Sequence, residues 1–210
     1  MNRLDPASLR LIAITDSLRD GVDGLAARAA AAVRGGATMV QLRLKDETPR
    51  TLVDIARALR AAVPSVPLLV NDRADVALAA GADGVHVGTD DVAPAALRRV
   101  VPARFIIGAS VGTESEVARA AGADYVGIGP VYASGSKPDA GVAIGVSRFA
   151  ELARLCGVPA VAIGGISADN VAALADSHPS GIAVISAVFS APDPADAARA
   201  LRSALDAIER

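Results

Sequence analysis

Three polar residues, Gln41, Arg43 and Lys45, alternate with leucines in the segment "QLRLK", and this spacing is suited to binding an anion. Side chains along an extended strand alternate between two faces, so the polar three share one face and the leucines share the other. Two neighbouring cations in a protein interior are costly unless an anion joins them, and guanidinium and ammonium groups suit phosphate oxygens. The pattern favours a phosphorylated ligand; the alternative is that the two cations pair with nearby acidic side chains.

Two aspartates, Asp72 and Asp91, follow the neighbouring apolar runs "PLLVN" and "GVHVG". If these runs are adjacent strands, both carboxylates can converge on one point. Carboxylates without a histidine or cysteine ligand favour a hard cation, most simply Mg²⁺, which usually takes one or two protein carboxylates and completes its shell with water and substrate phosphate. The alternative is that Asp90 or Asp91 only caps a helix.

A second anion site is indicated where the runs "PAVAIGG" and "GIAVISAV" end. Gly165 would let a phosphate approach the main chain closely, and Ile185 and Ser186 would supply backbone N–H donors. A tight turn that simply requires glycine is the alternative, with more weight for Gly164 than for the pair of glycines. The run "FIIGAS" places one further polar residue, Ser110, at a strand end.

The segment "GPVYASGSKPDAG" is longer and more polar than the roughly 2 to 6 residues that a strand-to-helix connection needs. Its Ser134, Ser136 and Lys137 could reach a bound phosphate. We therefore expect a lid that closes on phosphates and excludes water, the alternative being a solvated surface loop.

These residues need a scaffold, and the chain supplies one in repeated units. Eight short β-branched runs alternate with helical patterns rich in Ala, Leu and Arg, at residues 11–15, 39–44, 67–71, 84–88, 105–110, 125–129, 159–165 and 181–188. Such alternation predicts βαβ units and a parallel sheet. Eight units in 210 residues predict an α/β fold, a single (β/α)8 TIM barrel over residues 1–210 with its active site at the carboxyl ends of the strands. A doubly wound open sheet is less consistent, because no Gly-x-Gly-x-x-Gly follows the first run.

Composition restricts the partners. The net charge of −2 and the lack of a long basic run argue against nucleic acid, and no apolar stretch approaches the roughly 18 residues of a membrane span. The N-terminus lacks the apolar core of a signal peptide, and the single cysteine, Cys156, excludes a disulfide framework. We expect a cytoplasmic protein that binds small phosphorylated substrates, with neither nucleic acid nor membrane as a partner and with homo-oligomer formation left open.

The segments "QLRLK", "VND", "HVGTDD", "GAS", "GPVYASGSK", "VAIGGI" and "VISA" occur in this order. With them the chain resembles the thiamine phosphate synthase family along nearly its whole length, from "AITD" to "VISAVF". The resemblance implies a magnesium-dependent transferase that joins a pyrimidine methyl diphosphate to a thiazole phosphate, releasing diphosphate and forming thiamine phosphate.

The resemblance also implies roles for individual residues. The pyrimidine diphosphate would contact Gln41, Arg43, Lys45, Asn71, Ser110 and Lys137. The Mg²⁺ ligands would be Asp72 and Asp91. The thiazole phosphate would contact Ser134, Ser136, Gly165, Ile185 and Ser186. Arg43, Lys45 and Lys137 would be catalytic, by neutralising charge on the departing diphosphate.

The chain departs from the family pattern at a few positions. Its loop reads Ala-Ser-Gly-Ser-Lys where the family usually has Pro-Thr-x-Thr-Lys. The family often has other side chains at four further positions, which here are Ile12, Leu44, Thr89 and Gly112. The related thiazole tautomerase has a histidine at the position of Gly112 and lacks the aspartates, so the synthase is favoured over it. A non-catalytic binder of thiazole phosphate or thiamine phosphate is the third interpretation, which the set of cations disfavours. His86 is interpreted as a packed, structural residue.

Overall fold

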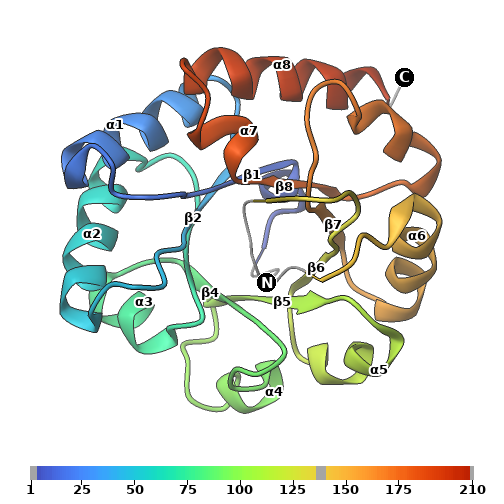
Figure 1. Ribbon diagram of the computed structural model, residues 1–210. Coiled ribbons are helices and arrows are strands. Elements are labelled where there is room, and N and C mark those ends of the chain that lie inside the picture. Colours follow the sequence, from blue (N-terminus) through green and yellow to red (C-terminus); the bar gives the residue numbers. More distant parts are fainter. Residues whose placement is uncertain (1–3, 136–140, 209–210) are drawn as a thin grey trace.

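The eight predicted strands form a closed parallel barrel in chain order, in a computed structural model that describes residues 4–135 and 141–208. The strands are β1 (Leu11–Ile14), β2 (Met39–Leu42), β3 (Leu68–Asn71), β4 (Gly84–Val87), β5 (Ile106–Val111), β6 (Tyr125–Ile128), β7 (Ala160–Ile163) and β8 (Gly181–Val184). β8 pairs with β1, with Ala13 opposite Val184, which closes the ring. Figure 1 shows this ring of strands surrounded by helices, so the predicted (β/α)8 barrel is confirmed.

The outer layer is less regular than the sequence pattern suggests. Its α-helices are α1 (Gly21–Arg34), α2 (Pro49–Ala62), α3 (Ala74–Ala80), α4 (Pro94–Leu97), α5 (Glu114–Val117), α6 (Gly145–Cys156), α7 (Ser186–Phe189) and α8 (Pro194–Ala207). The 3-10 helices are η1 (Pro6–Leu9), η2 (Ala118–Ala120) and η3 (Val171–Ser177). Only residues 112–124 connect β5 to β6, which is too little chain for two turns and a long helix, so short helices cover this side.

The last predicted strand is too long. The apolar run 181–188 was expected to be one strand, but β8 ends at Val184 and Ser186 begins α7. A short apolar run does not by itself distinguish a buried strand from a buried helix, and this one contains both.

Two apolar layers hold the barrel. The outer layer lies between strands and helices and includes Leu42, 1% exposed, with Leu44 packed against it. The inner layer fills the barrel's lower part with side chains such as Ile12 and Met39, and Leu9 of η1 joins it from the N-terminal end. The carboxyl ends of the strands are therefore the part of the interior left for polar side chains.

Among residues 4–135 and 141–208, no helix has the length and apolar character that crossing a membrane requires.

Candidate active site

A cavity of about 750 Å³ opens at the carboxyl ends of the strands, and all eight strands contribute to its lining. Its size is within the range of small-molecule sites. The residues singled out from the sequence that line it are Gln41, Arg43, Lys45, Asn71, Asp72, Asp91, Ser110, Ser134, Gly165, Ile185 and Ser186. Ser136 and Lys137 lie outside the described residues.

The end of β2 presents its polar residues to the cavity, as the strand alternation predicts. Gln41 is 3% exposed, and its Nε2 donates a hydrogen bond to Asn71 Oδ1 at 2.9 Å, which links β2 to β3. Arg43 and Lys45 follow on the same side and line the cavity. Leu44 packs instead against the outer core and is not among the residues that line the cavity.

Asp72 and Asp91 meet above β3 and β4. Asp72 directly follows β3 with a φ of 61°, in the left-handed region, and its N–H donates to the His86 carbonyl at 2.7 Å. Asp91 Oδ2 accepts from the Gly88 N–H at 2.7 Å. The residue at the N-cap of α4 is Ala93, so the alternative in which Asp90 or Asp91 caps this helix is wrong.

Asp91 perturbs the titration of Asp72. Burial, a hydrogen bond with Asp91 and the negative charge of Asp91 raise the pKa of Asp72 to about 6, while Lys45 and Arg43 act in the opposite direction. A cation bound between two partly buried carboxyl groups would stabilise their charged forms. Within the described residues there is no group of three or more His, Cys, Asp or Glu side chains arranged for a metal, so this pair would need a cation that accepts few protein ligands. Mg²⁺ is such a cation.

The opposite sector of the rim is shaped by two glycines after β7. Gly165 has a φ of 63°, and a Cβ there would lie 2.5 Å from the Ala133 carbonyl oxygen and 2.8 Å from Tyr132 Cβ. At Gly164, with a φ of 100°, a Cβ would lie 2.5 Å from Pro130 Cβ. Both glycines therefore let the segment after β6 lie directly on the end of β7. Both glycines have a positive φ, which agrees with the tight-turn interpretation, and both also line the cavity.

His86 and Tyr125 lie at the floor of the cavity, and the sequence analysis did not indicate Tyr125 as a site residue. His86 is 9% exposed, with Nδ1 3.0 Å from the Tyr125 hydroxyl and Nε2 3.1 Å from Ser110 Oγ. The histidine is packed, as interpreted, but it also contacts a residue of the candidate site and lines the cavity. Burial, with a smaller contribution from the charge of Asp124, raises the pKa of Tyr125, so its hydroxyl stays protonated and available as a donor.

A sequence signal for this cluster exists in the glycines around it. A Cβ at Gly108 would lie 2.5 Å from His86 Nδ1, and one at Gly127 would lie 3.2 Å from His86 Cε1. Glycines at inward positions of the two following strands make room for a large ring from β4. Read together with the alternation along β4, they would have placed His86 inside the barrel.

The family model, two relatives and one solved structure point to the same family. The family model described as thiamine monophosphate synthase matches residues 11–188. A thiamine-phosphate synthase of Xanthobacter autotrophicus is 46% identical over 204 residues, covering 95% of this chain and 97% of that protein. One from Methanoculleus marisnigri is 48% identical over 185 residues, covering 86% and 87%. The solved structure of thiamine phosphate pyrophosphorylase from Pyrococcus furiosus superposes with a TM-score of 0.85 at 35% identity, covering 97% of this chain and 98% of that one.

Proposed function

The chain belongs to the thiamine monophosphate synthase family, and from this premise we propose that it joins an aminopyrimidine methyl diphosphate to a thiazole phosphate, releasing diphosphate and forming thiamine phosphate. Membership makes it a transferase of thiamine biosynthesis. One observation carries the finer proposal: a single cavity holds cations beside paired carboxylates in one sector and a glycine-lined backbone surface in another. Two differently bound phosphorylated substrates suit such a cavity.

We name the first sector the diphosphate site, formed by Arg43 and Lys45 with Asp72 and Asp91. The two aspartates would hold Mg²⁺, since oxygen ligands suit it and their mutual repulsion favours a cation between them. When bound, Mg²⁺ would supply charge neutralisation for the diphosphate oxygens. Arg43 and Lys45 add fixed positive charge from the end of β2.

We name the second sector the thiazole phosphate site, formed by Gly165, Ile185 and Ser186, with Ser134 from the segment after β6. All four line the same cavity. Gly165 brings the main chain to the cavity wall without a side chain in the way. The assignments of Ser136 and Lys137 remain predictions from the sequence.

The proposed reaction breaks the bond between the pyrimidine methylene carbon and the diphosphate oxygen, which keeps the electron pair. Arg43 and Lys45 stabilise the negative charge that grows on the leaving group. The aminopyrimidine ring donates electrons to the methylene cation, and the thiazole nitrogen lone pair forms the new C–N bond. No proton moves in these steps, so no general base is needed. His86, held between Tyr125 and Ser110, then serves to fix polar groups at the cavity floor.

The test is an assay of the purified protein with pyrimidine diphosphate, thiazole phosphate and MgCl₂. We expect diphosphate and thiamine phosphate to form in equal amounts. Isomerisation of the thiazole without diphosphate release would instead support the tautomerase, and tight thiazole phosphate binding without either reaction would support a non-catalytic binder. Either outcome overturns the proposal.

A further inference from the structure

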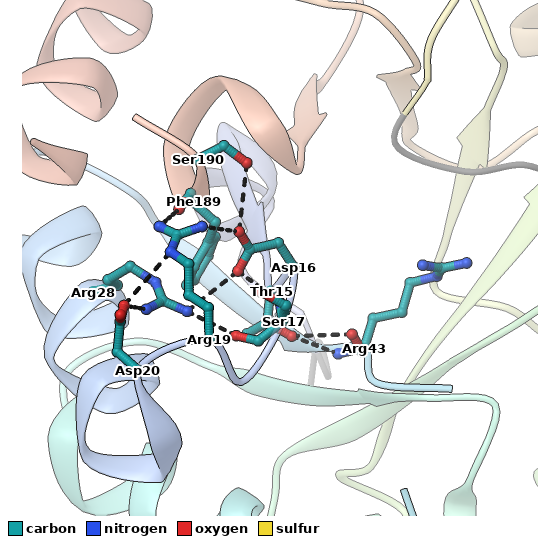
Figure 2. A network of polar contacts seen from close by, with 9 residues as sticks. All are labelled: Thr15, Asp16, Ser17, Arg19, Asp20, Arg28, Arg43, Phe189 and Ser190. Atoms are coloured by element: carbon teal, nitrogen blue, oxygen red, sulfur yellow. Dashed lines mark hydrogen bonds and ion pairs between the residues drawn. The ribbon is translucent and has the colours of Figure 1, made fainter. Parts of the chain in front are cut away.

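Thr15 and Asp16, the last two residues of the "AITD" segment, are not among the residues that line the large cavity. Both are nevertheless well covered: Thr15 is 0% exposed and the Asp16 side chain is 14% exposed. Figure 2 shows them within a network of polar contacts between the start of the β1–α1 connection, the end of β2 and the end of α7.

Thr15 holds the backbone of Arg43. Its Oγ1 accepts a hydrogen bond from the Arg43 N–H at 2.8 Å and donates one to the Arg43 carbonyl at 3.3 Å. β2 ends at Leu42, so the Thr15 hydroxyl continues the link between β1 and β2 at the point where their backbone hydrogen bonds stop. Figure 2 shows the Arg43 side chain extending away from this network. Because Thr15 fixes the Arg43 backbone, it also limits where the guanidinium group can lie.

Asp16 holds the far end of α7. Its Oδ2 accepts from Arg19 Nη1 at 2.6 Å and from Ser190 Oγ at 3.4 Å, and Arg19 Nη2 donates to the Phe189 carbonyl at 2.6 Å. α7 has only four residues, beginning at Ser186, so restraining its last turn restrains Ser186 as well. The fully buried Phe189 ring anchors the same turn in the outer core.

Arg28 of α1 fixes the carboxylate itself. This arginine is 8% exposed, its Nη2 lies 3.3 Å from Asp16 Oδ1 and donates to the Ser17 carbonyl at 2.7 Å, and it also pairs with Asp20. A buried arginine committed to one loop leaves Asp16 little freedom to move. The loop is thus a fixed point between β2 and α7.

We propose that Thr15 and Asp16 are positioning residues that set the two substrate sites from this one point. Thr15 places Arg43 for the diphosphate site, and Asp16 places α7, and with it Ser186, for the thiazole phosphate site. The inference rests on the proposed function, because that function assigns the two ligands. It makes a selective prediction: two adjacent residues affect two different substrates.

The Thr15 arm compares Thr15→Val and Thr15→Ser with wild type. Valine keeps the shape without the hydroxyl, and serine restores the hydroxyl. We expect Thr15→Val to weaken binding of inorganic diphosphate with MgCl₂ about tenfold in calorimetry and to lower turnover, Thr15→Ser to recover most of both, and thiazole phosphate binding to change less than about twofold.

A matched control exists at the other end of the barrel. Thr38 Oγ1 likewise ties backbone to backbone, accepting from the Leu11 N–H at 2.9 Å and donating to the Ser8 carbonyl at 2.9 Å. Thr38→Val should lower the Tm while leaving diphosphate binding and turnover at wild-type values. If Thr15→Val behaves like Thr38→Val, the role of Thr15 is only structural and the proposal is wrong.

The Asp16 arm uses Asp16→Asn, with Asp206→Asn as the control because Asp206 also joins two arginines, Arg10 at 3.5 Å and Arg202 at 3.2 Å. We expect Asp16→Asn to weaken thiazole phosphate binding about tenfold while diphosphate binding stays near wild type, and Asp206→Asn to change neither. Equal loss of both ligands, or of neither, contradicts the proposal.

These binding measurements separate the inference from the proposed function. A wild-type protein that binds both ligands but forms no thiamine phosphate overturns the function, and the selective losses then still decide the positioning roles. A wild-type protein that binds neither ligand overturns both.

Discussion

At the scale of single residues, Asp72 has two properties that most residues avoid. Its φ of 61° lies in the left-handed region, where Asn and Asp are favoured among residues other than glycine. Its carboxyl group is also partly buried beside a second acid, which raises its pKa to about 6. Strain and like-charge crowding at one position are typical of a site shaped for a ligand rather than for stability.

Asp72→Asn should separate the function of this carboxylate from its effect on stability. Asparagine tolerates the same backbone conformation, so the change removes the charge without new strain. We expect turnover to fall about a hundredfold or more, while the metal-free variant at pH 8 has a Tm equal to or above that of wild type, because a like charge beside Asp91 is gone. Steady-state kinetics and thermal unfolding measure the two effects. Full wild-type activity in EDTA would rule out the metal assignment.

The raised pKa of Asp72 also predicts how the metal effect depends on pH. Between its ordinary pKa of 3.8 and the folded value of about 6, the metal-free folded protein holds a proton that the unfolded chain releases. This contribution to stability is therefore present at low pH and is lost as pH rises through about 6. Mg²⁺ competes with that proton, so the Tm increase on adding MgCl₂ should be larger at pH 7.5 than at pH 5. In Asp72→Asn this dependence should largely disappear.

Lys45→Ala tests whether the two sites are assigned to the correct sectors. Lys45 lines the cavity beside Asp72, and it acts to lower the pKa of that acid. Removing it should raise the KM for the pyrimidine diphosphate about tenfold, lower turnover as well, and leave thiazole phosphate binding unchanged. Arg57→Ala removes an exposed cation on α2, paired with Asp54 at 3.9 Å, and should alter neither. A loss confined to thiazole phosphate would mean that the two sites are exchanged.

At the scale of elements, the contact between the end of β7 and the segment after β6 decides the shape of the thiazole phosphate site. Gly165→Ala should disturb it in a way that a matched glycine does not. Gly157, the C-cap of α6, has nearly the same φ, 65°, but a Cβ there would meet nothing within 4 Å, whereas at Gly165 it would meet the backbone of Ala133. Both variants should lose about 1–2 kcal/mol to the strained conformation.

Only Gly165→Ala should lose more than that and also weaken thiazole phosphate binding. Chemical denaturation and calorimetry of the two variants give the comparison. Equal stability losses and unchanged binding in both would show that the close approach at Gly165 has no part in the site.

At the same scale, sequence patterns predicted the strands better than the helices. A β-branched run flanked by helical patterns is a local property, and all eight runs contain strands. The length of α5 depends instead on how much chain remains between β5 and β6, whose positions the closed barrel fixes, and local periodicity does not encode this. The predicted end of the last strand was wrong because the run 181–188 continues without a break in its sequence pattern, while the backbone turns at Ile185 and begins α7 at Ser186.

At the scale of the whole molecule, two general rules were enough to predict which side chains line the cavity. Side chains alternate along a strand, and the active site of a (β/α)8 barrel lies at the carboxyl ends of its strands. These rules could not predict contacts that cross between elements distant in sequence. The glycines of β5 and β6 could have placed His86 inside the barrel, but not its partner. Its hydrogen bond to Tyr125, like that of Arg19 to the Phe189 carbonyl, depends on three-dimensional closure of the ring. Asn71 and Ser110, whose roles rest on the resemblance, line the same cavity, and these roles stay predictions.

The closed ring makes a last prediction about unfolding. Every strand is hydrogen-bonded to two neighbours, so no sector can open without breaking ladders on both sides. A ligand bound in one sector should therefore stabilise the entire chain in one transition. Diphosphate with MgCl₂ at about 100 times its Kd should add about 2.7 kcal/mol, and for a chain of this size the Tm should rise by about 5–10 °C. Thr38→Val should lower the starting Tm but leave this increase unchanged, because it lies at the opposite end of the barrel from the ligand. A calorimetric trace with two transitions, only one of which shifts, would show that residues 1–210 do not unfold as the single domain expected from the sequence.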